Sequence, residues 1–416
     1  MRDRRPADGA VAHSVRPLRV LYVVTHPMTA RILLRGQLAF LRDAGLEVGI
    51  ASAPGADLDT VARQEAVTAF AVPGLRREIA PAHDVAALVR LIGVMRRFRP
   101  HVVNAGTPKA GLLGMLAARL LAVPIRLYTL RGLRLETAGG LARRLLERGE
   151  TITAGSAHRV VCVSESLRRR CLELGLAEPA KTIVLGRGSS NGVDADRFHP
   201  SARRSPGTSA LREELGIPAA APVVGFVGRL TRDKGVADLA EAFCGVIAER
   251  LPAAWLLLVG EYEPADRVPG CAVRRLETHP RVIRAGFVED PESWYGVMSV
   301  LAMPSRREGF PNAPLEAAAS GVPVVGYRST GMTDAVEEDV TGTLVETGDV
   351  KGLAGAIVRY LCEPELARRH GQAGRDRVER WFRRERVWEE WLGEYHRLAL
   401  EKWGEGERVE GRRATP

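Results

Sequence analysis

The sequence predicts an α/β protein in which two parallel sheets, each flanked by helices, face each other across a cleft. Short aliphatic runs alternate with longer helical patterns in the first half of the chain, and the alternation starts again after residue 200. Strands that alternate with helices form βαβ units, whose strands run parallel. The chain has 416 residues, which is more than one ordinary core accommodates. We therefore expect two Rossmann-like domains.

The first half carries the elements of one such domain in order. An aliphatic run over residues 19–25 predicts a buried strand, and the pattern over residues 30–44 predicts the helix that follows. Another helix is expected to end at Arg99 and Pro100. The remaining strands of this half are expected at residues 48–51, 101–104, 126–129 and 159–164.

The second half repeats the pattern. Residues 222–227 predict its first strand, and a helix over residues 236–249 leads into a strand over residues 255–259. Further strands are expected at residues 300–304 and 323–327. This restart is typical of a second Rossmann-like domain.

Polar and glycine-containing stretches predict how the chain is divided. Residues 186–194 and 201–209 suggest a boundary between a first domain at 17–195 and a second at 196–371. Residues 372–400 predict a long closing helix with several tryptophans, which either packs on the surface of the core or crosses back onto the first domain. The tails 1–16 and 401–416 are polar and charged, so we expect them to be disordered.

The formal net charge of +10 is unevenly distributed. Residues 18–199 hold 26 Lys and Arg against 15 Asp and Glu, whereas residues 200–400 hold 26 against 29. A basic first half predicts an anionic partner. Nucleic acid is disfavoured, because no nucleic-acid motif is present and aromatic residues make up only 5% of the chain. We expect an anionic membrane surface or a diphosphate lipid instead.

The sequence also indicates a cellular compartment for the protein. The five cysteines are scattered and form no C-x-x-C pair, which is typical of reduced thiols in a cytosolic protein. No stretch reaches the roughly 18 apolar residues of a membrane helix. The Arg-rich N-terminus lacks the apolar segment of a signal peptide. We expect a cytoplasmic protein that is at most peripheral to the inner face of the plasma membrane.

The second domain opens with a strand, a glycine turn and a helix, a combination that binds anions. Gly228 and Gly235 frame the turn, in which Arg229 offers a guanidinium fork and Lys234 a point charge for phosphate oxygens. Basic residues in such a loop are also often merely solvated. The spacing of a Walker loop is absent.

A second segment, residues 304–316, favours ligand binding over simple solvation of these basic residues. It follows a strand and leads into a helix for which Asn312 is the expected N-cap. The helix N-terminus would point its positive end out of the sheet at the edge where ligands bind in such folds. Glu308 lies in the loop and Glu316 in the first turns, so two carboxylates are placed to bind the hydroxyls of a polyol.

At these residues the resemblance to a known family becomes specific. Glu308 and Glu316 lie in a segment that resembles the E-x7-E motif of glycosyltransferase family 4, retaining enzymes of GT-B architecture. The run from Gly228 to Gly235 is similar to the diphosphate loop of that family. The matches extend over roughly residues 18–400, and segments at 107–111, 130–137 and 188–194 resemble the subgroup that acts on lipid-linked sugars in capsule, O-antigen and glycan assembly.

The resemblance implies a role for each matching residue. Arg229 and Lys234, with Gly228, would hold the donor diphosphate, and Glu308 would contact the transferred sugar. Glu316 would hold the ribose hydroxyls. Gly309, Phe310, Pro311 and Asn312 would lie near the sugar, and all of them except Pro311 have a backbone N–H group to donate. Because positive groups stabilise the leaving diphosphate, no metal or other cofactor is expected, and the spacing of metal ligands is absent.

The acceptor side departs from the family. Many relatives carry a histidine in the loop after the fourth strand, where this chain has Asn104, which cannot act as a general base at neutral pH. This fits a mechanism in which the departing phosphate oxygen takes the acceptor's proton. We expect His26, Thr107, Lys109 and Arg131 on the acceptor side of the cleft, although His26 also suits a purely structural role.

Residues 141–148 form a basic amphipathic pattern. Arg143, Arg144 and Arg148 alternate with leucines over two helical turns. Such a helix either presents a solvated arginine face or lies on an anionic membrane surface, which the charge of the first domain favours.

These observations lead to one expected function and three alternatives. We expect transfer of a sugar, an N-acetylated hexosamine from UDP, to a polyprenyl diphosphate-linked sugar with retention. One alternative is a soluble small-molecule acceptor. Another is a nucleotide-sugar 2-epimerase of the same architecture, against which the E-x7-E motif argues. A non-catalytic sugar-nucleotide-binding subunit would have lost Arg229, Lys234 or Glu308, and all three are present.

Overall fold

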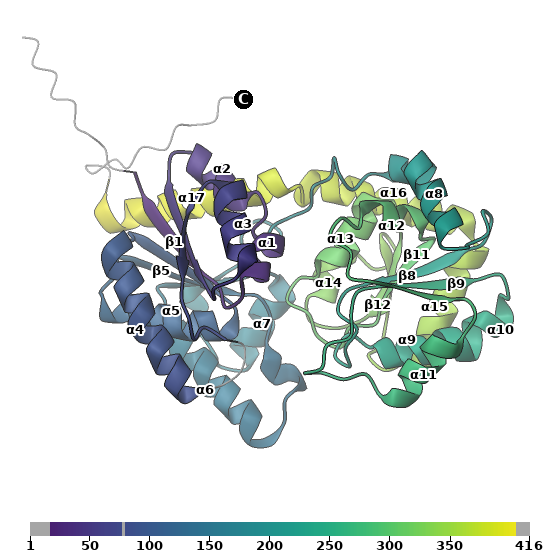
Figure 1. The fold of residues 1–416 in the computed structure, drawn as a ribbon, viewed down its shortest axis with the longest axis horizontal. Coiled ribbons are helices and arrows are strands. Elements are labelled where there is room, and N and C mark those ends of the chain that lie inside the picture. Colours follow the sequence, from purple (N-terminus) through teal and green to yellow (C-terminus); the bar gives the residue numbers. More distant parts are fainter. Residues whose placement is uncertain (1–16, 77–79, 405–416) are drawn as a thin grey trace, which may run out of the picture.

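The computed structural model describes residues 17–76 and 80–404, which form two parallel sheets flanked by helices (Figure 1). The predicted tail at residues 1–16 lies outside the described residues, as do residues 405–416. The two-domain α/β architecture predicted from the sequence is confirmed.

Among the described residues, the first sheet contains seven parallel strands in the order β3-β2-β1-β4-β5-β6-β7. Val20 in β1 lies opposite Val48 in β2 on one side and Val102 in β4 on the other, so β1 is at the centre. The strands are β1 (Arg19–Val23), β2 (Glu47–Ser52), β3 (Thr68–Ala71), β4 (Val102–Gly106), β5 (Ile125–Leu130), β6 (Arg159–Cys162) and β7 (Thr182–Ile183).

Helices cover both faces of this sheet (Figure 1). They are α1 (Pro27–Leu33), α2 (Gln37–Asp43), α3 (Ala56–Glu65), α4 (Pro81–Phe98), α5 (Pro108–Leu120), η1 (Arg134–Thr137), α6 (Gly140–Ser156), α7 (Glu165–Glu173) and η2 (Pro179–Lys181). The single helix expected over residues 30–44 is wrong, because Gly36 has φ of +80° and separates α1 from α2. A Cβ at Gly36 would lie 2.6 Å from the ring of Trp388, so a distant helix imposes this break.

The second sheet has six parallel strands in the order β10-β9-β8-β11-β12-β13. They are β8 (Val223–Val227), β9 (Trp255–Val259), β10 (Val282–Gly286), β11 (Val300–Met303), β12 (Val324–Tyr327) and β13 (Gly342–Val345). The sequence patterns missed β3, β7, β10 and β13, which are the four edge strands of the two sheets. An edge strand is covered on fewer sides, so it needs no continuous aliphatic run.

The second sheet is also covered by helices. They are η3 (Pro200–Arg204), α8 (Pro206–Glu214), α9 (Val236–Ala242), the π-helical turn η4 (Phe243–Ile247), α10 (Ala248–Arg250), α11 (Gly270–Thr278), α12 (Glu292–Val297), α13 (Asn312–Ala319), α14 (Met332–Ala335), α15 (Val350–Cys362) and α16 (Pro364–Trp381). The boundary placed at 195/196 falls in the segment between β7 and β8 and stays a prediction. The helix expected over residues 236–249 is present, with the π-helical turn in its middle.

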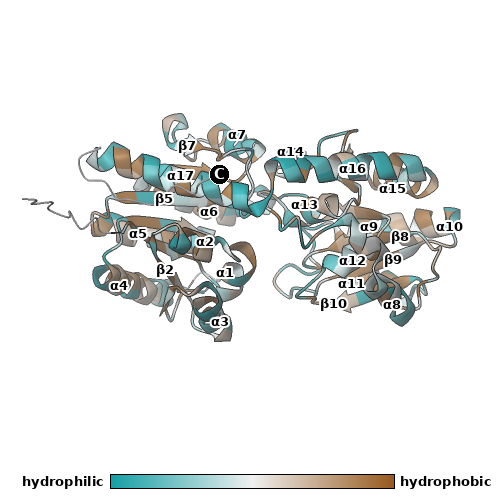
Figure 2. Ribbon diagram, turned by 90° about the horizontal axis from the view of Figure 1, so that it is seen from above, coloured by the Kyte–Doolittle hydropathy of each residue, from teal (hydrophilic) through white to brown (hydrophobic). Residues whose placement is uncertain are grey.

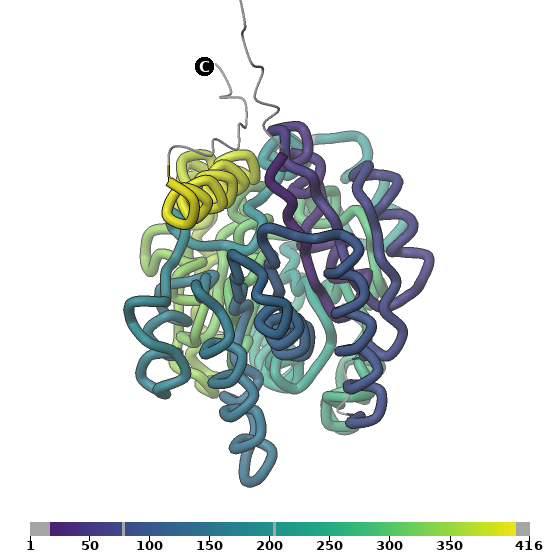
Figure 3. The backbone as a smooth tube through the Cα atoms, turned by 90° about the vertical axis from the view of Figure 1, so that its left-hand side faces the viewer, coloured from purple at the N-terminus to yellow at the C-terminus, as the bar shows by residue number. Residues whose placement is uncertain are grey.

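The last helix, α17 (Arg384–Trp403), returns to the first domain, as predicted (Figures 1 and 3). The continuous helix expected over residues 372–400 is wrong, because α16 ends at Trp381. At the break, the Val193 N–H donates to Phe382 O at 2.7 Å and the Arg384 N–H to Val193 O at 3.0 Å. These bonds join the two chain segments that cross between the domains.

α17 also corrects the predicted C-terminal tail. It extends to Trp403, whose ring packs edge-on against His101 at 5.8 Å between centroids. Seen from above, α17 alternates apolar and polar residues along its length (Figure 2). Its buried Trp391 and Tyr395 belong to a core shared with β1 and α2.

Candidate functional site

The predicted site residues follow the carboxyl ends of central strands in both sheets. His26 follows β1 and Arg131 follows β5, whereas Arg229 follows β8 and Glu308 follows β11. This is the edge at which doubly wound sheets bind ligands. The two sheets therefore direct their ligand-binding edges towards each other.

Loops of the two domains touch at this place. The Ser164 hydroxyl donates to Gly309 O at 2.6 Å, and the Gly331 N–H donates to Ser166 Oγ at 2.8 Å. A Cβ at Gly309 would lie only 2.0 Å from Arg131 O. A glycine is thus required where the loop after β11 meets the loop after β5.

The predicted diphosphate loop has the backbone that its glycines suggest. Gly228 has φ of +148°, and Gly235 has φ of +70° as the N-cap of α9. A Cβ at Gly235 would lie 2.0 Å from Pro304 O, so the loop packs directly on the segment that carries Glu308. This close approach brings together two segments that lie about seventy residues apart.

Both cations of this loop form ion pairs. Lys234 Nζ pairs with Glu308 Oε1, and these side chains are only 14% and 10% exposed. Arg229 pairs with Glu263 and is half-exposed. The structure thus joins the predicted catalytic residues Lys234 and Glu308 directly. Sequence reasoning missed Glu263, whose signal was its position just after the neighbouring strand β9.

Glu316 has a different environment from Glu308. It lies within α13, and the Tyr295 hydroxyl donates to its Oε2 at 2.7 Å. Burial raises the pKa of the Glu316 carboxyl, while the hydrogen bond from Tyr295 and the charge of Arg197 act in the opposite direction. The two carboxylates of the motif are therefore distinguished by their partners. Tyr295 and Arg197 carried no sequence signal.

Residues 309–311 lead into α13, which begins at Asn312. Phe310 is buried and packs its ring 5.4 Å from that of Phe382. The expectation that Asn312 is the N-cap is wrong: Pro311 has the extended backbone of the cap, and Asn312 is the first helical residue. Asn312 Oδ1 is buried without a hydrogen-bond partner among the described residues.

Three of the expected acceptor-side residues have local partners. His26 is exposed and caps α1, accepting from the Met28 N–H at 3.2 Å. Thr107 has φ of +80° and shares a 2.6 Å hydrogen bond with Thr25. Lys109 Nζ lies 2.7 Å from Asp84 Oδ1, which ties α5 to α4. His26 therefore has at least a structural role.

Arg131 is the exception on this side. Its Nε and Nη1 are buried and have no hydrogen-bond partner among the described residues. Burial lowers the pKa of the guanidinium to about 10, which the hydroxyls of Tyr22 and Tyr395 partly oppose. A buried guanidinium without a counter-ion is costly, so an anion at this position would stabilise it.

A buried polar network lies next to Arg131. Asn104 Nδ2 donates to Tyr395 Oη at 2.7 Å and Asn104 Oδ1 accepts from Thr129 Oγ1 at 2.7 Å, while Tyr395 Oη is 2.6 Å from Tyr22 Oη. Asn104 is thus a buried link between the sheet and α17. Its partner Tyr395 lies 291 positions away, so only the fold reveals the network.

The predicted basic helix is confirmed as the N-terminal part of α6. Arg143 bonds Glu147 at 2.8 Å, whereas Arg144 and Arg148 are exposed. Leu141 and Leu145 on the same part of the helix are 72% and 51% exposed. This segment of α6 projects from the first domain (Figures 1 and 3).

Three general features complete the description. Within residues 17–76 and 80–404, no three His, Cys, Asp or Glu side chains gather as metal ligands would. All five cysteines are free thiols. No helix in the described part of the chain is both long and apolar enough to cross a membrane.

Comparisons with known proteins agree with this geometry. Residues 30–188 match the glycosyl transferase 4-like domain, and residues 221–363 match glycosyl transferases group 1. The chain is 35% identical over 374 residues to the capsular polysaccharide biosynthesis glycosyltransferase CapM of Staphylococcus aureus, covering 89% of this chain and 95% of that one. It is 28% identical to an Escherichia coli α-1,3-galactosyltransferase named for UDP-Gal and α-D-GlcNAc-diphosphoundecaprenol, covering 73% and 77%.

Solved structures show the same fold. Sucrose-phosphate synthase from Thermosynechococcus elongatus has a TM-score of 0.75 at 22% identity, over 92% of this chain and 100% of that one. Anabaena HepE in complex with UDP-glucose has a TM-score of 0.74 at 20% identity, over 91% and 99%. With matched domains in both halves and a relative similar over nearly its whole length, the chain belongs to the family 4 glycosyltransferases, enzymes of GT-B architecture.

Proposed function

We propose that this glycosyltransferase moves an N-acetylated hexosamine from UDP to a polyprenyl diphosphate-linked sugar during surface-glycan assembly. The observation that carries the proposal is the Lys234–Glu308 pair, which lies where the donor loop meets Arg131. The names of the S. aureus and E. coli relatives support a capsule or lipid-linked acceptor.

On the donor side, the proposal assigns the diphosphate to Arg229 and Lys234. Negative charge grows on the leaving diphosphate as the glycosidic bond breaks, and fixed positive groups stabilise it in the role a metal ion has in other enzymes. A phosphate that binds Lys234 competes with Glu308 for the ammonium group. Glu308 is then released to accept hydrogen bonds from the sugar, while Glu316 holds the ribose.

The proposal includes retention at the anomeric carbon. The described residues near Arg131 offer no free histidine base, because Asn104 is buried in its network and His26 caps α1. The departing phosphate oxygen then takes the acceptor's proton on the face from which it leaves. Arg229 and Lys234 moderate the basicity of that oxygen.

On the acceptor side, the proposal gives Arg131 an anionic group to bind. Its buried Nε and Nη1 have hydrogen-bonding capacity that the described residues leave unused. The diphosphate of a lipid-linked acceptor supplies such an anion, and a guanidinium binds phosphate oxygens bidentately. Thr107 and Lys109 shape the neighbouring loop.

The membrane would be met by α6. Arg144 and Arg148 lie near the exposed Leu141 and Leu145, so this helix combines positive charge with apolar side chains. Such a surface binds the interface of an anionic bilayer. The enzyme would act as a peripheral protein at the cytoplasmic face, near the diphosphate of its lipid acceptor.

A second candidate is transfer to a soluble acceptor. A D-inositol 3-phosphate glycosyltransferase of Segniliparus rotundus is 28% identical, over 74% of this chain and 69% of that one. A 2-deoxystreptamine N-acetyl-D-glucosaminyltransferase of Streptomyces fradiae is 29% identical, over 82% and 86%. A phosphorylated polyol would also satisfy Arg131. The family assignment favours transfer over epimerisation.

One assay separates these proposals. Release of nucleotide from UDP-, GDP- and dTDP-sugars is measured with a polyprenyl diphosphate-sugar, with inositol phosphate and without acceptor, each in the presence of a chelator. We expect fastest release from a UDP-N-acetylhexosamine with the lipid acceptor, unchanged by chelator. Activity only with inositol phosphate would decide for the second candidate, and activity that requires added Mg²⁺ or Mn²⁺ would refute the diphosphate role of Arg229 and Lys234.

A further inference from the structure

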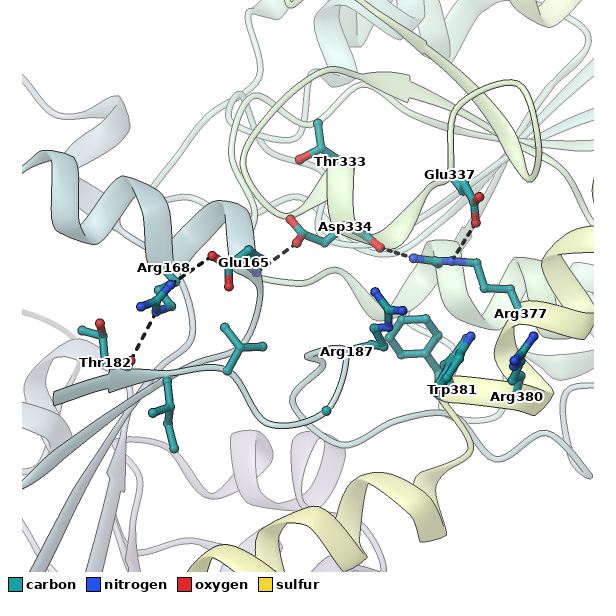
Figure 4. Close-up of a pocket in the computed structure, with 14 residues that line it drawn as sticks. Glu165, Arg168, Thr182, Arg187, Thr333, Asp334, Glu337, Arg377, Arg380 and Trp381 are labelled. Atoms are coloured by element: carbon teal, nitrogen blue, oxygen red, sulfur yellow. Dashed lines mark hydrogen bonds and ion pairs between the residues drawn. The ribbon is translucent and has the colours of Figure 1, made fainter. Parts of the chain in front are cut away.

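A cavity lies between the domains, on the side of Phe382. It has a volume of about 970 Å³ and contains none of the predicted donor residues. Its walls come from α7, from β7 and the segment after it, from α14, and from the end of α16 (Figure 4). Both domains and both chain crossings therefore border it.

Most charged groups of this cavity are satisfied by neighbours. Arg168 bonds Glu165 at 3.1 Å, and Arg377 lies 3.5 Å from Glu337. Asp334 accepts from the Glu165 N–H at 2.9 Å and so caps α7 across the domain boundary. These contacts leave little excess charge at the groups that they join.

The end of α16 and the segment after β7 also bring unneutralised positive charge to this cavity. Arg187 and Arg380, which line the cavity, place their guanidinium carbons 5.1 and 4.9 Å from the ring centroid of Trp381, and Arg386, which lies outside the lining, is 5.0 Å from the same ring. None of the three has an ion pair among the described residues, although Glu390 lies near Gly186. Three charges around one ring lie within about 10 Å of one another and repel. Arg187, Trp381 and Arg380 follow one another along the cavity in Figure 4.

This cluster lies where the chain crosses between the two domains. Arg187 belongs to the first crossing between the domains, and Trp381 ends α16 at the second crossing. The two crossings are joined by the hydrogen bonds between Val193 and residues 382 and 384. An anion that binds Arg187 and Arg380 together would therefore contact both segments about which the domains can rotate.

We propose that this cavity is a second anion site for a diphosphate group, and that its occupation changes the affinity of the donor site through the arrangement of the domains. Guanidinium groups bind phosphate oxygens in fork geometry, and two or three of them match the charge of a diphosphate. Coupling follows if the ligand binds one domain arrangement better than another. The inference rests on the proposed function in one respect: the test assumes that UDP binds the donor site and blocks it.

The test measures binding of inorganic pyrophosphate by calorimetry to the full chain saturated with UDP. We expect a pyrophosphate site that remains in Arg131→Gln, a variant that removes the anion site proposed for the acceptor, and that binds at least tenfold more weakly in Arg187→Gln/Arg380→Gln. If UDP itself fills both sites, wild type shows two UDP sites and the variant one, which also supports the proposal. Pyrophosphate should change the UDP dissociation constant at least threefold in wild type and less than 1.5-fold in the variant.

The matched control is Arg359→Gln/Arg368→Gln, which removes the same charge from exposed ion pairs on α15 and α16. Equal weakening in the control, or no second site in wild type, overturns the proposal. Binding without any change in UDP affinity refutes the coupling. Repeating the titration with farnesyl diphosphate in place of pyrophosphate distinguishes a lipid-linked diphosphate from a free one. None of these measurements requires turnover.

Discussion

The residues proposed to bind the donor are held in ion pairs that a bound diphosphate would rearrange. Lys234 and Glu308 are both largely buried, so their charges interact in a medium less polar than water. Arg229 is more exposed and its pair with Glu263 is better screened. Lys234 therefore depends on its partner more than Arg229 does.

The diphosphate role predicts a large loss when either cation is removed. Arg229→Ala and Lys234→Ala should each cost about 2–4 kcal/mol of transition-state stabilisation, because charge that develops on the leaving group loses a fixed partner. The measurement is kcat/KM with a saturating acceptor. Arg232→Ala, which removes an exposed cation of the same loop, is the control. Activity within threefold of wild type in both variants would defeat the assignment.

The two carboxylates should differ in what they change. Glu308→Gln should lower turnover more than nucleotide affinity, since Glu308 is assigned to the sugar. Glu316→Gln should weaken the nucleotide itself, because it is assigned to the ribose and keeps its bond from Tyr295 as an amide. UDP affinity and kcat are measured for each variant. Equal loss of UDP binding in both would refute the division of roles.

At the scale of elements, α6 has two different faces. Its N-terminal turns expose leucines and arginines, whereas Glu150 further along is buried and accepts from the Tyr128 hydroxyl at 2.7 Å. Burial raises the pKa of Tyr128 as well. One helix thus offers both a surface for binding and a buried titratable group.

The exposed face predicts salt-dependent membrane binding. Each basic residue near an anionic bilayer contributes about 1 kcal/mol within a Debye length. The protein should therefore sediment with anionic liposomes at low salt and be released near about 0.5 M salt. Neutralising Arg143, Arg144 and Arg148 together should weaken this binding and leave UDP affinity unchanged. Wild-type protein that fails to sediment at low salt, or a triple variant that binds equally well, would remove the membrane role.

The buried face predicts a pH dependence of stability. Burial raises the pKa of Glu150 from 4.5 to about 7. Between these values the folded protein keeps a proton that the unfolded chain has released, so the free energy of unfolding falls as pH rises. The contribution is complete below pH 4.5 and lost above about pH 7, a change of about 3 kcal/mol.

Glu150→Gln should remove this dependence, because the amide still accepts from Tyr128 and carries no charge. Urea unfolding at pH 5 should give similar stability for wild type and variant, and at pH 8 the variant should be more stable by about 3 kcal/mol. Glu147→Gln, on the exposed side of α6, is the control. Parallel pH profiles for wild type and Glu150→Gln would contradict the shift.

At the scale of the whole molecule, the site depends on how closely the two domains approach. Gly309 allows the loop after β11 to lie against Arg131 O. Gly331 packs in turn on Gly309, and a Cβ added at Gly331 would lie 2.5 Å from Gly309 O. A side chain at Gly309 would separate the domains, whereas one at Gly331 would displace the loop of Glu308 and Gly309 within the second domain.

Gly309→Ala should therefore reduce turnover at least tenfold while the UDP dissociation constant changes less than threefold, since the nucleotide contacts are assigned to the second domain. Steady-state kinetics and UDP titration give both values. Gly355→Ala, where an added Cβ meets nothing within 4 Å, should leave activity unchanged. Wild-type turnover in Gly309→Ala would show that this contact is unnecessary.

The sequence by itself determined the central strands and the restart after residue 200, and it alone suggested the donor assignment of Gly228, Arg229, Lys234, Glu308 and Glu316, which stays a prediction. These signals are local: a buried central strand needs a continuous apolar run, and a phosphate loop needs its glycines and cations a few residues apart. The edge strands β3, β7, β10 and β13 lacked the signal because they are less completely covered.

The tertiary structure alone decided which residues meet. The breaks at Gly36 and at the end of α16 depend on Trp388 and Val193, which are distant in sequence. Tyr395 reaches Asn104 across 291 positions. Arg131 Nε and Nη1 are buried without a hydrogen-bond partner among the described residues, which no local sequence pattern indicates. The hydrophobic periodicity of a segment indicates which of its residues are buried, whereas the packing of the whole chain determines which residues contact one another.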